Sequence, residues 1–319
     1  MTRLALNLLN GIYGWILSLA VVSASVFAGY SMWDNAQIYK SAADVQSQIR
    51  QYKPVEDTKG GPSFDELRKI NGDVIGWITV DGTNIDYPVL QGKTNQEYMD
   101  KDVYGNFSLA GSIFLDVRNS PDFSDKYSLI YGHNMDNHLM FGDLAMFKDK
   151  EFFRDNTTAT LLVPGESRKQ NVVAIMQIPA GTEEIFNPDM WKNNLSGLGE
   201  FLEKQSIWYH SDWTEKMKKD PNSVQITVLV TCSDGSTNDR TVLVLIRELP
   251  KDPVNPPDPI NPVIPDYTGG GSGGGIYGTG PKPTGDLSNP KLWTIMIMGS
   301  ILFIVTFESL ERYIKKRRE

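Results

Sequence analysis

The sequence is poor in the residues that build metal centres, covalent cross-links and nucleic-acid surfaces. Its 319 residues include one Cys and three His. A single Cys can form neither an internal disulfide nor a multi-cysteine zinc or iron-sulfur site, and the histidines have no companion ligands at a recognised spacing. We therefore expect no cofactor and no metal. Lys and Arg cluster only at the extreme C-terminus and the net charge is -8, which argues against nucleic acid as a partner.

Charge is also missing from a long stretch near the N-terminus. Residues 4–30 are almost entirely apolar or small, with no charged residue between Arg3 and Asp34. A helix of about 20 apolar residues suffices to cross the bilayer core, so residues 1–31 are predicted to be an uncleaved membrane anchor. The small residues at 24–28 leave a cleaved signal peptide as an alternative.

A second apolar run lies near the other end of the chain. It spans 292–307, which predicts a C-terminal transmembrane helix over 291–310 followed by a basic tail over 311–319. The positive-inside rule places this tail in the cytoplasm, and Arg3 favours the same side for the N-terminus. Both termini are then cytoplasmic, the lipid bilayer is a partner, and the region between the two anchors is extracytoplasmic.

Composition divides the region between the anchors into three parts. Residues 32–62 are predicted to be a helical stalk with a linker, because apolar positions recur there at helical spacing. Residues 63–249 are predicted to form the folded domain, beginning with a short helix capped near Ser63. Residues 250–290 are rich first in Pro and then in Gly, which is typical of a linker.

The folded domain contains about eight short β-type runs separated by Gly, Asn, Asp and Pro. Such spacing is typical of a mainly β barrel or sandwich. A helix is predicted as an insertion over 189–205. The predicted strands cover residues 76–80, 85–90, 112–115, 127–131, 159–163, 171–177, 224–231 and 241–247.

The single Cys lies where a strand ends. Cys232 follows the apolar run 224–231 and, by the period of two, shares the face of Val230. A polar loop then leads to Arg240, which opens the next strand, so a hairpin would bring this cation close to Cys232. A lone Cys is commonly a buried hydrophobe, whereas a neighbouring positive charge favours the thiolate.

His133 lies just after another apolar strand, where its side chain can face a cleft. His138 and His210 are interpreted as surface histidines. A Cys and a His together would suit acyl transfer, in which a thiolate attacks, a thioester forms, and a second nucleophile releases it. Arg240 would stabilise the oxyanion of the tetrahedral intermediate.

Several motifs resemble those of one family, the sortases, which are membrane-anchored transpeptidases of Gram-positive bacteria. The three chemical motifs are Tyr131-Gly132-His133-Asn134, Val230-Thr231-Cys232-Ser233 and Asp239-Arg240-Thr241-Val242. The sequence is also similar to class B of that family in the runs 76–78, 85–89, 111–116 and 140–144 and in the inserted helix.

The resemblance implies an eight-stranded sortase β-barrel and a defined chemistry. Cys232 would attack the Thr-Gly bond of a C-terminal sorting signal on a surface protein or pilin, and His133 would move the protons. The amine acceptor would be a cell-wall precursor or a pilin Lys, and the protein would sit in the membrane of a Gram-positive bacterium. A C-terminal membrane segment is more typical of pilus-building sortases. Positions that match substrate contacts of the family are Asn95, Met99, Tyr131 and Thr231.

The tail itself has the layout of a sorting signal. Residues 281–286 read Pro-Lys-Pro-Thr-Gly-Asp and precede an apolar run and a basic end. The simpler interpretation is a linker and second anchor; the alternative is a degenerate substrate mimic.

Two other functions remain open from the sequence. One is a non-catalytic membrane-tethered barrel that binds wall peptides, and the other is an extracellular cysteine hydrolase. Hydrolysis and transpeptidation share the same thioester and differ only in the nucleophile that reaches it.

Overall fold

The computed structural model describes residues 2–55, 63–231 and 239–250, with side chains described from Gly11 onward. Cys232, the linker over 251–290, the predicted C-terminal transmembrane helix, the basic tail and the segment 281–286 lie outside the described residues. The chain divides into two units, and the unit that holds the folded domain begins at Ile38.

The N-terminal apolar run forms a helix, as predicted. Helix α1 spans Thr2–Arg50. Among the residues that the structure describes, its portion Gly11–Arg50 is the one helix that is long and apolar enough to cross a membrane. Its last turns also lie within the domain unit, where Ala42 and Ile49 are buried.

Polar contacts fix the end of α1 on the turn between the first two strands. The side chains of Gln46 and Arg50 both donate to the carbonyl oxygen of Asn84, each at 3.0 Å. Lys53 Nζ lies 2.7 Å from Asp86 Oδ1. The predicted stalk therefore contacts the domain through specific hydrogen bonds as well as through apolar packing.

Eight strands close into a barrel, which confirms the predicted fold. The chain of hydrogen-bonded neighbours runs from β11 to β8, and β11 also pairs with β8, so the sheet has no open edge at this point. Around the barrel the strands are β11 (Asp239–Glu248), β10 (Val224–Thr231), β4 (Tyr127–Gly132), β3 (Ile113–Leu115), β2 (Asp86–Leu90), β1 (Val74–Val80), β7 (Thr158–Val163) and β8 (Glu166–Pro179). All eight predicted strands are found at their expected places.

Shorter elements complete the domain. The helices are α2 (Phe64–Ile70), η1 (Gly142–Lys148), α3 (Lys150–Asp155), α4 (Pro188–Trp191), α5 (Leu195–Gln205), α6 (Ser211–Lys219) and η2 (Pro221–Ser223). The remaining strands are β5 (Asn134–Met135), β6 (Leu139–Met140) and β9 (Trp208–Tyr209). The predicted helix over 189–205 is two helices, because the side chain of Asn194 accepts from Gly197 N at 3.1 Å and starts α5 anew.

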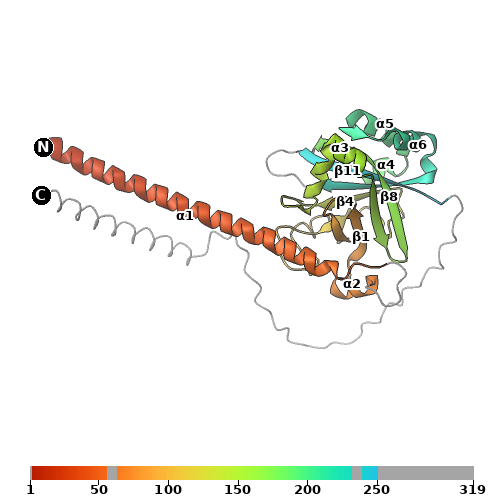
Figure 1. The fold of residues 1–319 in the computed structure, drawn as a ribbon, viewed down its shortest axis with the longest axis horizontal. Helices are drawn as coiled ribbons and strands as arrows, with labels where there is room; N and C mark the ends of the chain where they lie inside the picture. Colours follow the sequence, from red (N-terminus) through yellow and green to blue (C-terminus); the bar gives the residue numbers. More distant parts are fainter. Residues whose placement is uncertain (1, 56–62, 232–238, 251–319) are drawn as a thin grey trace. The chain divides into compact units, whose positions relative to one another are not determined.

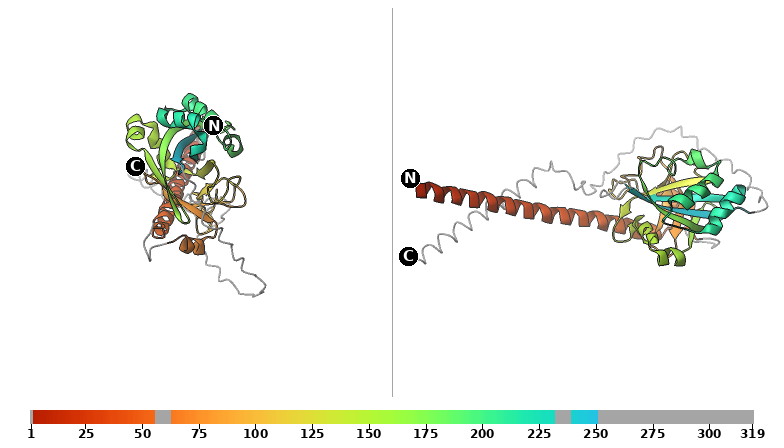
Figure 2. Two further views of the ribbon diagram at one scale, coloured as in Figure 1. Left: turned by 90° about the vertical axis from the view of Figure 1, so that its right-hand side faces the viewer. Right: turned by 90° about the horizontal axis from the view of Figure 1, so that it is seen from above.

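Alternation along the strands sends their side chains into different apolar layers. Leu229, Leu243 and Leu245 belong to the cluster inside the barrel. Val228 and Val230 point the other way, into a layer shared with α4, α5 and α6. Figure 1 places these three helices on one side of the strands and α2 on the opposite side, and the left view of Figure 2 agrees.

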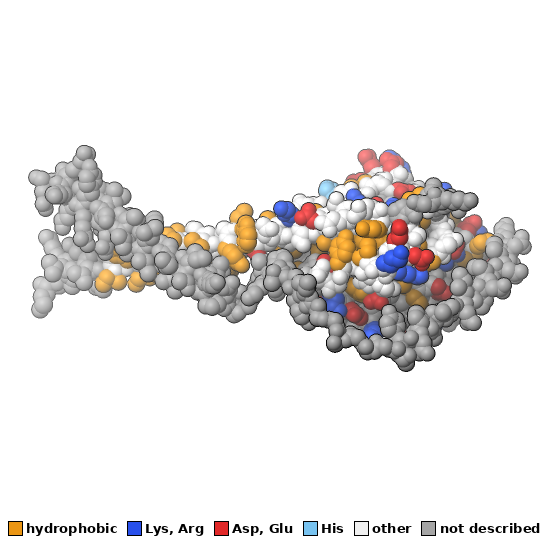
Figure 3. Space-filling view, turned by 90° about the horizontal axis from the view of Figure 1, so that it is seen from below, with side chains coloured by type: hydrophobic (Ala, Val, Ile, Leu, Met, Phe, Trp, Pro, Cys, Tyr) orange, Lys and Arg blue, Asp and Glu red, His pale blue; other side chains and the backbone are white. Residues whose placement is uncertain are grey.

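Part of the domain surface is apolar. Figure 3 shows hydrophobic side chains gathered beside a group of Lys, Arg, Asp and Glu side chains on one face. The exposed large hydrophobic residues of the domain include Met99, Phe107, Leu109, Val117, Met190, Ile207 and Tyr209.

Candidate active site

The site is organised by a pair of parallel strands. β4 and β10 run side by side, and their last residues, Gly132 and Thr231, are register partners. His133 follows the first strand in the sequence and Cys232 follows the second. Because the carboxyl ends of parallel strands meet at the same edge of a sheet, the fold directs both chain segments to one edge of the barrel.

Gly132 is required by the packing before His133. A Cβ at this position would lie 2.4 Å from Ile113 Cδ1 and 2.6 Å from Phe141 Cδ2. Both of these neighbours are buried, so neither can swing into solvent. The absence of a side chain lets β4 run against the barrel interior and fixes where His133 emerges.

We expect Gly132→Ala to destabilise the fold by about 1–3 kcal/mol, because overpacking of a filled interior costs about that much. It should also displace His133 and lower activity. Urea unfolding and a peptide-transfer assay measure the two effects. Gly181→Ala is the matched control, because a Cβ there meets nothing within 4 Å. Equal stability of the two variants would contradict this account of Gly132.

His133 is half-buried, and its backbone carbonyl accepts from Phe141 N at 2.9 Å. Burial lowers the pKa of the His133 imidazole below its usual value of 6.5. His138 is exposed and lies 2.7 Å from Asp143, while His210 stacks on Phe153. His133 is thus the histidine at the end of β4, and the other two are held by different partners.

Arg240 lies across the hairpin from the end of β10. β10 and β11 pair with Val230 opposite Val242. The Arg240 guanidinium donates from Nη1 to the carbonyl oxygen of Thr231 at 3.2 Å, and its Cζ lies 5.8 Å from the centre of the Phe186 ring. The predicted approach of this cation to the end of β10 is therefore present in the structure, although Cys232 itself lies outside the described residues.

The four predicted substrate contacts differ in what surrounds them. The hydroxyl of Thr231 is buried and accepts from Thr241 N at 3.0 Å, so it is already engaged within the hairpin. Tyr131 donates to Asp116 Oδ2 at 3.2 Å, and Asn95 donates to the same oxygen at 3.0 Å. Met99 is 52% exposed on the segment between β2 and β3, and its predicted role stays a prediction.

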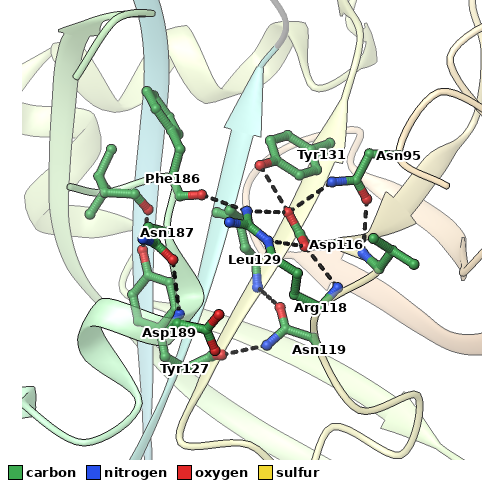
Figure 4. Close-up of polar contacts among 12 residues, drawn as sticks. Asn95, Asp116, Arg118, Asn119, Tyr127, Leu129, Tyr131, Phe186, Asn187 and Asp189 are labelled. Carbon is green, nitrogen blue, oxygen red and sulfur yellow. Dashed lines mark hydrogen bonds and ion pairs between the residues drawn. The ribbon is translucent and has the colours of Figure 1, made fainter. Parts of the chain in front are cut away.

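The structure adds a polar network that the sequence did not reveal. Asp116 is buried at the end of β3 and contacts Tyr131, Asn95 and Arg118. Arg118 in turn donates to the carbonyl oxygen of Phe186 at 2.7 Å. Figure 4 shows Arg118 between the Asp116 carboxylate and Phe186, with Tyr131 and Asn95 on the far side of that carboxylate.

The charge of the Asp116 carboxylate is maintained in this network. Burial alone would raise its pKa, but hydrogen bonds from Arg118, together with the charge of Arg118 and the bond from Asn95, hold the pKa below its ordinary value. Burial and the charge of Asp116 raise the pKa of the Tyr131 hydroxyl, so Tyr131 stays protonated and donates. The sequence marked Asn95 and Tyr131 as predicted substrate contacts, but for Arg118 its only signal was the Asp-x-Arg spacing after a short strand.

Among the described residues, no group of three or more His, Cys, Asp or Glu side chains is placed to hold a metal ion. The polar groups at the edge of β4 and β10 are instead an imidazole and a guanidinium. This arrangement suits proton transfer and the stabilisation of a developing negative charge.

Comparison with known proteins gives relatives of one kind. No family model matches the chain. The crystal structure of a class B sortase of Streptococcus pyogenes involved in pilus biogenesis is 38% identical, with a TM-score of 0.52, and covers 59% of this chain and 100% of that one. This chain belongs to the class B sortases.

Other sortases support the same membership. Sortase B of Clostridium perfringens is 32% identical with a TM-score of 0.51, over 58% of this chain and 98% of that structure. Curated Sortase B proteins of Listeria monocytogenes and Staphylococcus aureus are 36% identical over 146 residues and 40% identical over 92 residues. These matches cover 44% and 29% of this chain, and 59% and 38% of the length of those two proteins. The resemblance inferred from the sortase motifs is confirmed.

Proposed function

We propose that this chain is a sortase transpeptidase in which Cys232, His133 and Arg240 carry the chemistry. The observation that supports this proposal is the register of the parallel pair, where Thr231 lies opposite Gly132. His133 follows one of these residues and Cys232 follows the other in the sequence, while Arg240 bonds the carbonyl of Thr231. This register supports a shared site for the acid-base group and the cation at one end of the barrel, next to the residue that Cys232 follows in the sequence.

The reaction proceeds in two halves. The Cys232 thiol gives its proton to His133, the resulting thiolate attacks the carbonyl carbon of Thr in a Thr-Gly bond, and the oxyanion that forms is stabilised by the Arg240 guanidinium. The C–N bond then breaks as His133 protonates the departing Gly amine, which leaves a thioester on Cys232. In the second half His133 takes a proton from an incoming amine, an amide forms, and the thiolate leaves.

The donor substrate is a surface protein or pilin with a C-terminal sorting signal, and Asn95, Met99, Tyr131 and Thr231 are proposed to bind it. The acceptor is an amine, either of a cell-wall precursor or of a pilin Lys. The Streptococcus pyogenes relative is described as involved in pilus biogenesis, which supports testing the Lys acceptor first.

The apolar part of α1 is proposed to anchor the protein in the cell membrane, with the domain on the extracytoplasmic side. Its length and composition over Gly11–Arg50 support the anchor. The domain boundaries predicted from composition, and a cytoplasmic position for both termini, belong to the same proposal.

The test uses the full chain in detergent, incubated with a panel of sorting-signal peptides and examined by intact-mass spectrometry. A gain in mass equal to the N-terminal peptide fragment is expected, and a peptide in which Thr is replaced by Val is the control. Adding a Lys-containing pilin peptide or a wall-precursor amine should remove the adduct and yield a ligated product. Hydrolysed peptide alone, in the presence of every amine, would favour a hydrolase. No adduct from folded protein would favour a binding module.

A further inference from the structure

The buried carboxylate of Asp116 is the centre of a saturated set of hydrogen bonds. Its Oδ1 accepts from the backbone N and from Nε of Arg118, at 2.9 and 2.8 Å. Its Oδ2 accepts from Arg118 Nη2 at 2.8 Å, from Asn95 and from Tyr131. The Asp116 side chain has no exposed surface. A buried carboxylate with five donors is held in one orientation, and so is the bidentate Arg118 beside it.

Two side chains from the barrel region hold consecutive carbonyl groups of the segment before α4. Arg118 Nη2 donates to the carbonyl of Phe186 at 2.7 Å, and the Tyr127 hydroxyl donates to the carbonyl of Ile185 at 2.5 Å. Ile185 and Phe186 belong to segment 180–187, and both lie in a turn, outside any helix or strand. Its placement therefore depends on these two bonds together with the burial of Ile185 and the bond from Trp191 Nε1 to the carbonyl of Glu184 at 2.6 Å.

Within the described part of the chain, the ring of Phe186 is one of two contacts of the Arg240 guanidinium. The other is the carbonyl of Thr231. A cation within about 6 Å of an aromatic face is attracted to it. Arg has many rotamers, and a group that stabilises a transition state contributes most when its position is fixed before the reaction. A shift of Phe186 would release one of these two contacts.

We propose that Asp116 and Arg118 are positioning residues for the transpeptidation, which hold Phe186 against Arg240 and so fix the guanidinium where the oxyanion develops. This inference rests on the proposed function. Among the described residues, Arg118 contacts Phe186 and Phe186 contacts Arg240, whereas the Asp116–Arg118 ion pair contacts Asn95 and Tyr131 directly. The ion pair thereby connects Asn95 and Tyr131, two predicted substrate contacts, to the Arg240 guanidinium.

The test compares Arg118→Lys with the wild type in the full chain. Lys keeps the positive charge beside Asp116, but it lacks the planar fork that bonds Asp116 and the Phe186 carbonyl together. We expect kcat for peptide transfer to fall about tenfold with KM within about twofold, since removing a whole oxyanion donor costs about 10²–10³. Phe186→Leu keeps the carbonyl and removes the ring, and should reproduce the loss of kcat.

The decisive comparison is made in the Arg240→Ala background. If Arg118 acts through Arg240, then Arg118→Lys adds no further loss there; a purely structural role would lower kcat by the same factor in both backgrounds. Arg154→Lys is the matched control, because Arg154 forms a similar two-bond pair with Asp155 on the exposed surface of α3. Wild-type kcat in Arg118→Lys, or equal losses in the two backgrounds, would overturn the proposal.

Amide hydrogen exchange provides a readout that needs no activity. In Arg118→Lys the exchange of residues 180–187 should become faster, and in Arg154→Lys it should not change. If the wild-type chain forms no thioester with any peptide, the proposed function fails, and unchanged exchange at 180–187 would separately refute the role of Arg118.

Discussion

Replacing Cys232 with Ala should abolish both thioester formation and peptide transfer. Cys232 is the single Cys of the chain, so no other thiol can take its place. Removing the nucleophile of a covalent mechanism commonly costs several orders of magnitude, and we expect a loss of at least about 10⁴-fold in kcat. Intact-mass spectrometry after incubation with a sorting-signal peptide measures the adduct, and a chromatographic assay measures the ligated product.

Two controls separate chemistry from folding for Cys232. The urea midpoint of Cys232→Ala should stay close to that of the wild type, and Cys232→Ser keeps the shape of the side chain while replacing the thiol with a poor nucleophile. A peptide adduct that persists in Cys232→Ala would show that another residue is acylated and would reject the assigned nucleophile.

Replacing His133 with Gln should lower kcat by about 10²–10⁴, the range typical of a removed general acid-base group. Gln preserves some polarity at the end of β4 but cannot carry the proton to the leaving amine. His138→Gln is the matched control, because His138 lies on the exposed part of the hairpin that follows His133 and pairs with Asp143. Equal kcat losses in the two variants would show that the effect comes from the hairpin and not from the imidazole of His133.

The lowered pKa of His133 also predicts a change of stability with pH. The folded chain binds a proton on this imidazole less tightly than the unfolded chain does. The stability of the neutral form is thus present above pH 6.5 and is lost as the pH falls from 6.5 through the lowered folded pKa. Over that window, urea unfolding should show a steeper loss of stability for the wild type than for His133→Gln. Parallel curves would contradict the burial of this side chain.

The sequence predicted the barrel well because its strands are short apolar runs bounded by turn residues. It missed α6, since Ser211–Lys219 is dominated by charged residues and buries only Thr214 and Met217. It also treated α4 and α5 as one helix, because the Asn194 cap between them is a local side-chain effect. A strand pattern depends only on residues that are close in the sequence, so strands can be predicted without knowledge of the fold.

The site was predictable where motifs mark it and unpredictable where distant segments meet. His133 and Arg240 stand beside recognisable strands, so their positions followed from the sequence. The network of Asp116, Arg118 and Phe186 could not be predicted in this way, because the bond between Arg118 and Phe186 joins segments 68 residues apart. For Thr231, the hydroxyl is already bonded within the hairpin, and a substrate contact through this residue stays a prediction.

The parallel pairing of β4 with β10 has a consequence for the order of folding. β4 ends at Gly132, and its partner begins only at Val224, after β5 to β9 and α3 to α6 have been synthesised. Contacts between such distant segments form slowly, because the loop-closure entropy is lost before the pairing is gained. The strand ends that carry His133 and bond Arg240 are therefore placed side by side only as the barrel closes. A newly synthesised chain therefore lacks the assembled site until the barrel has closed, and full-length chain that has not yet folded would have no transpeptidase activity.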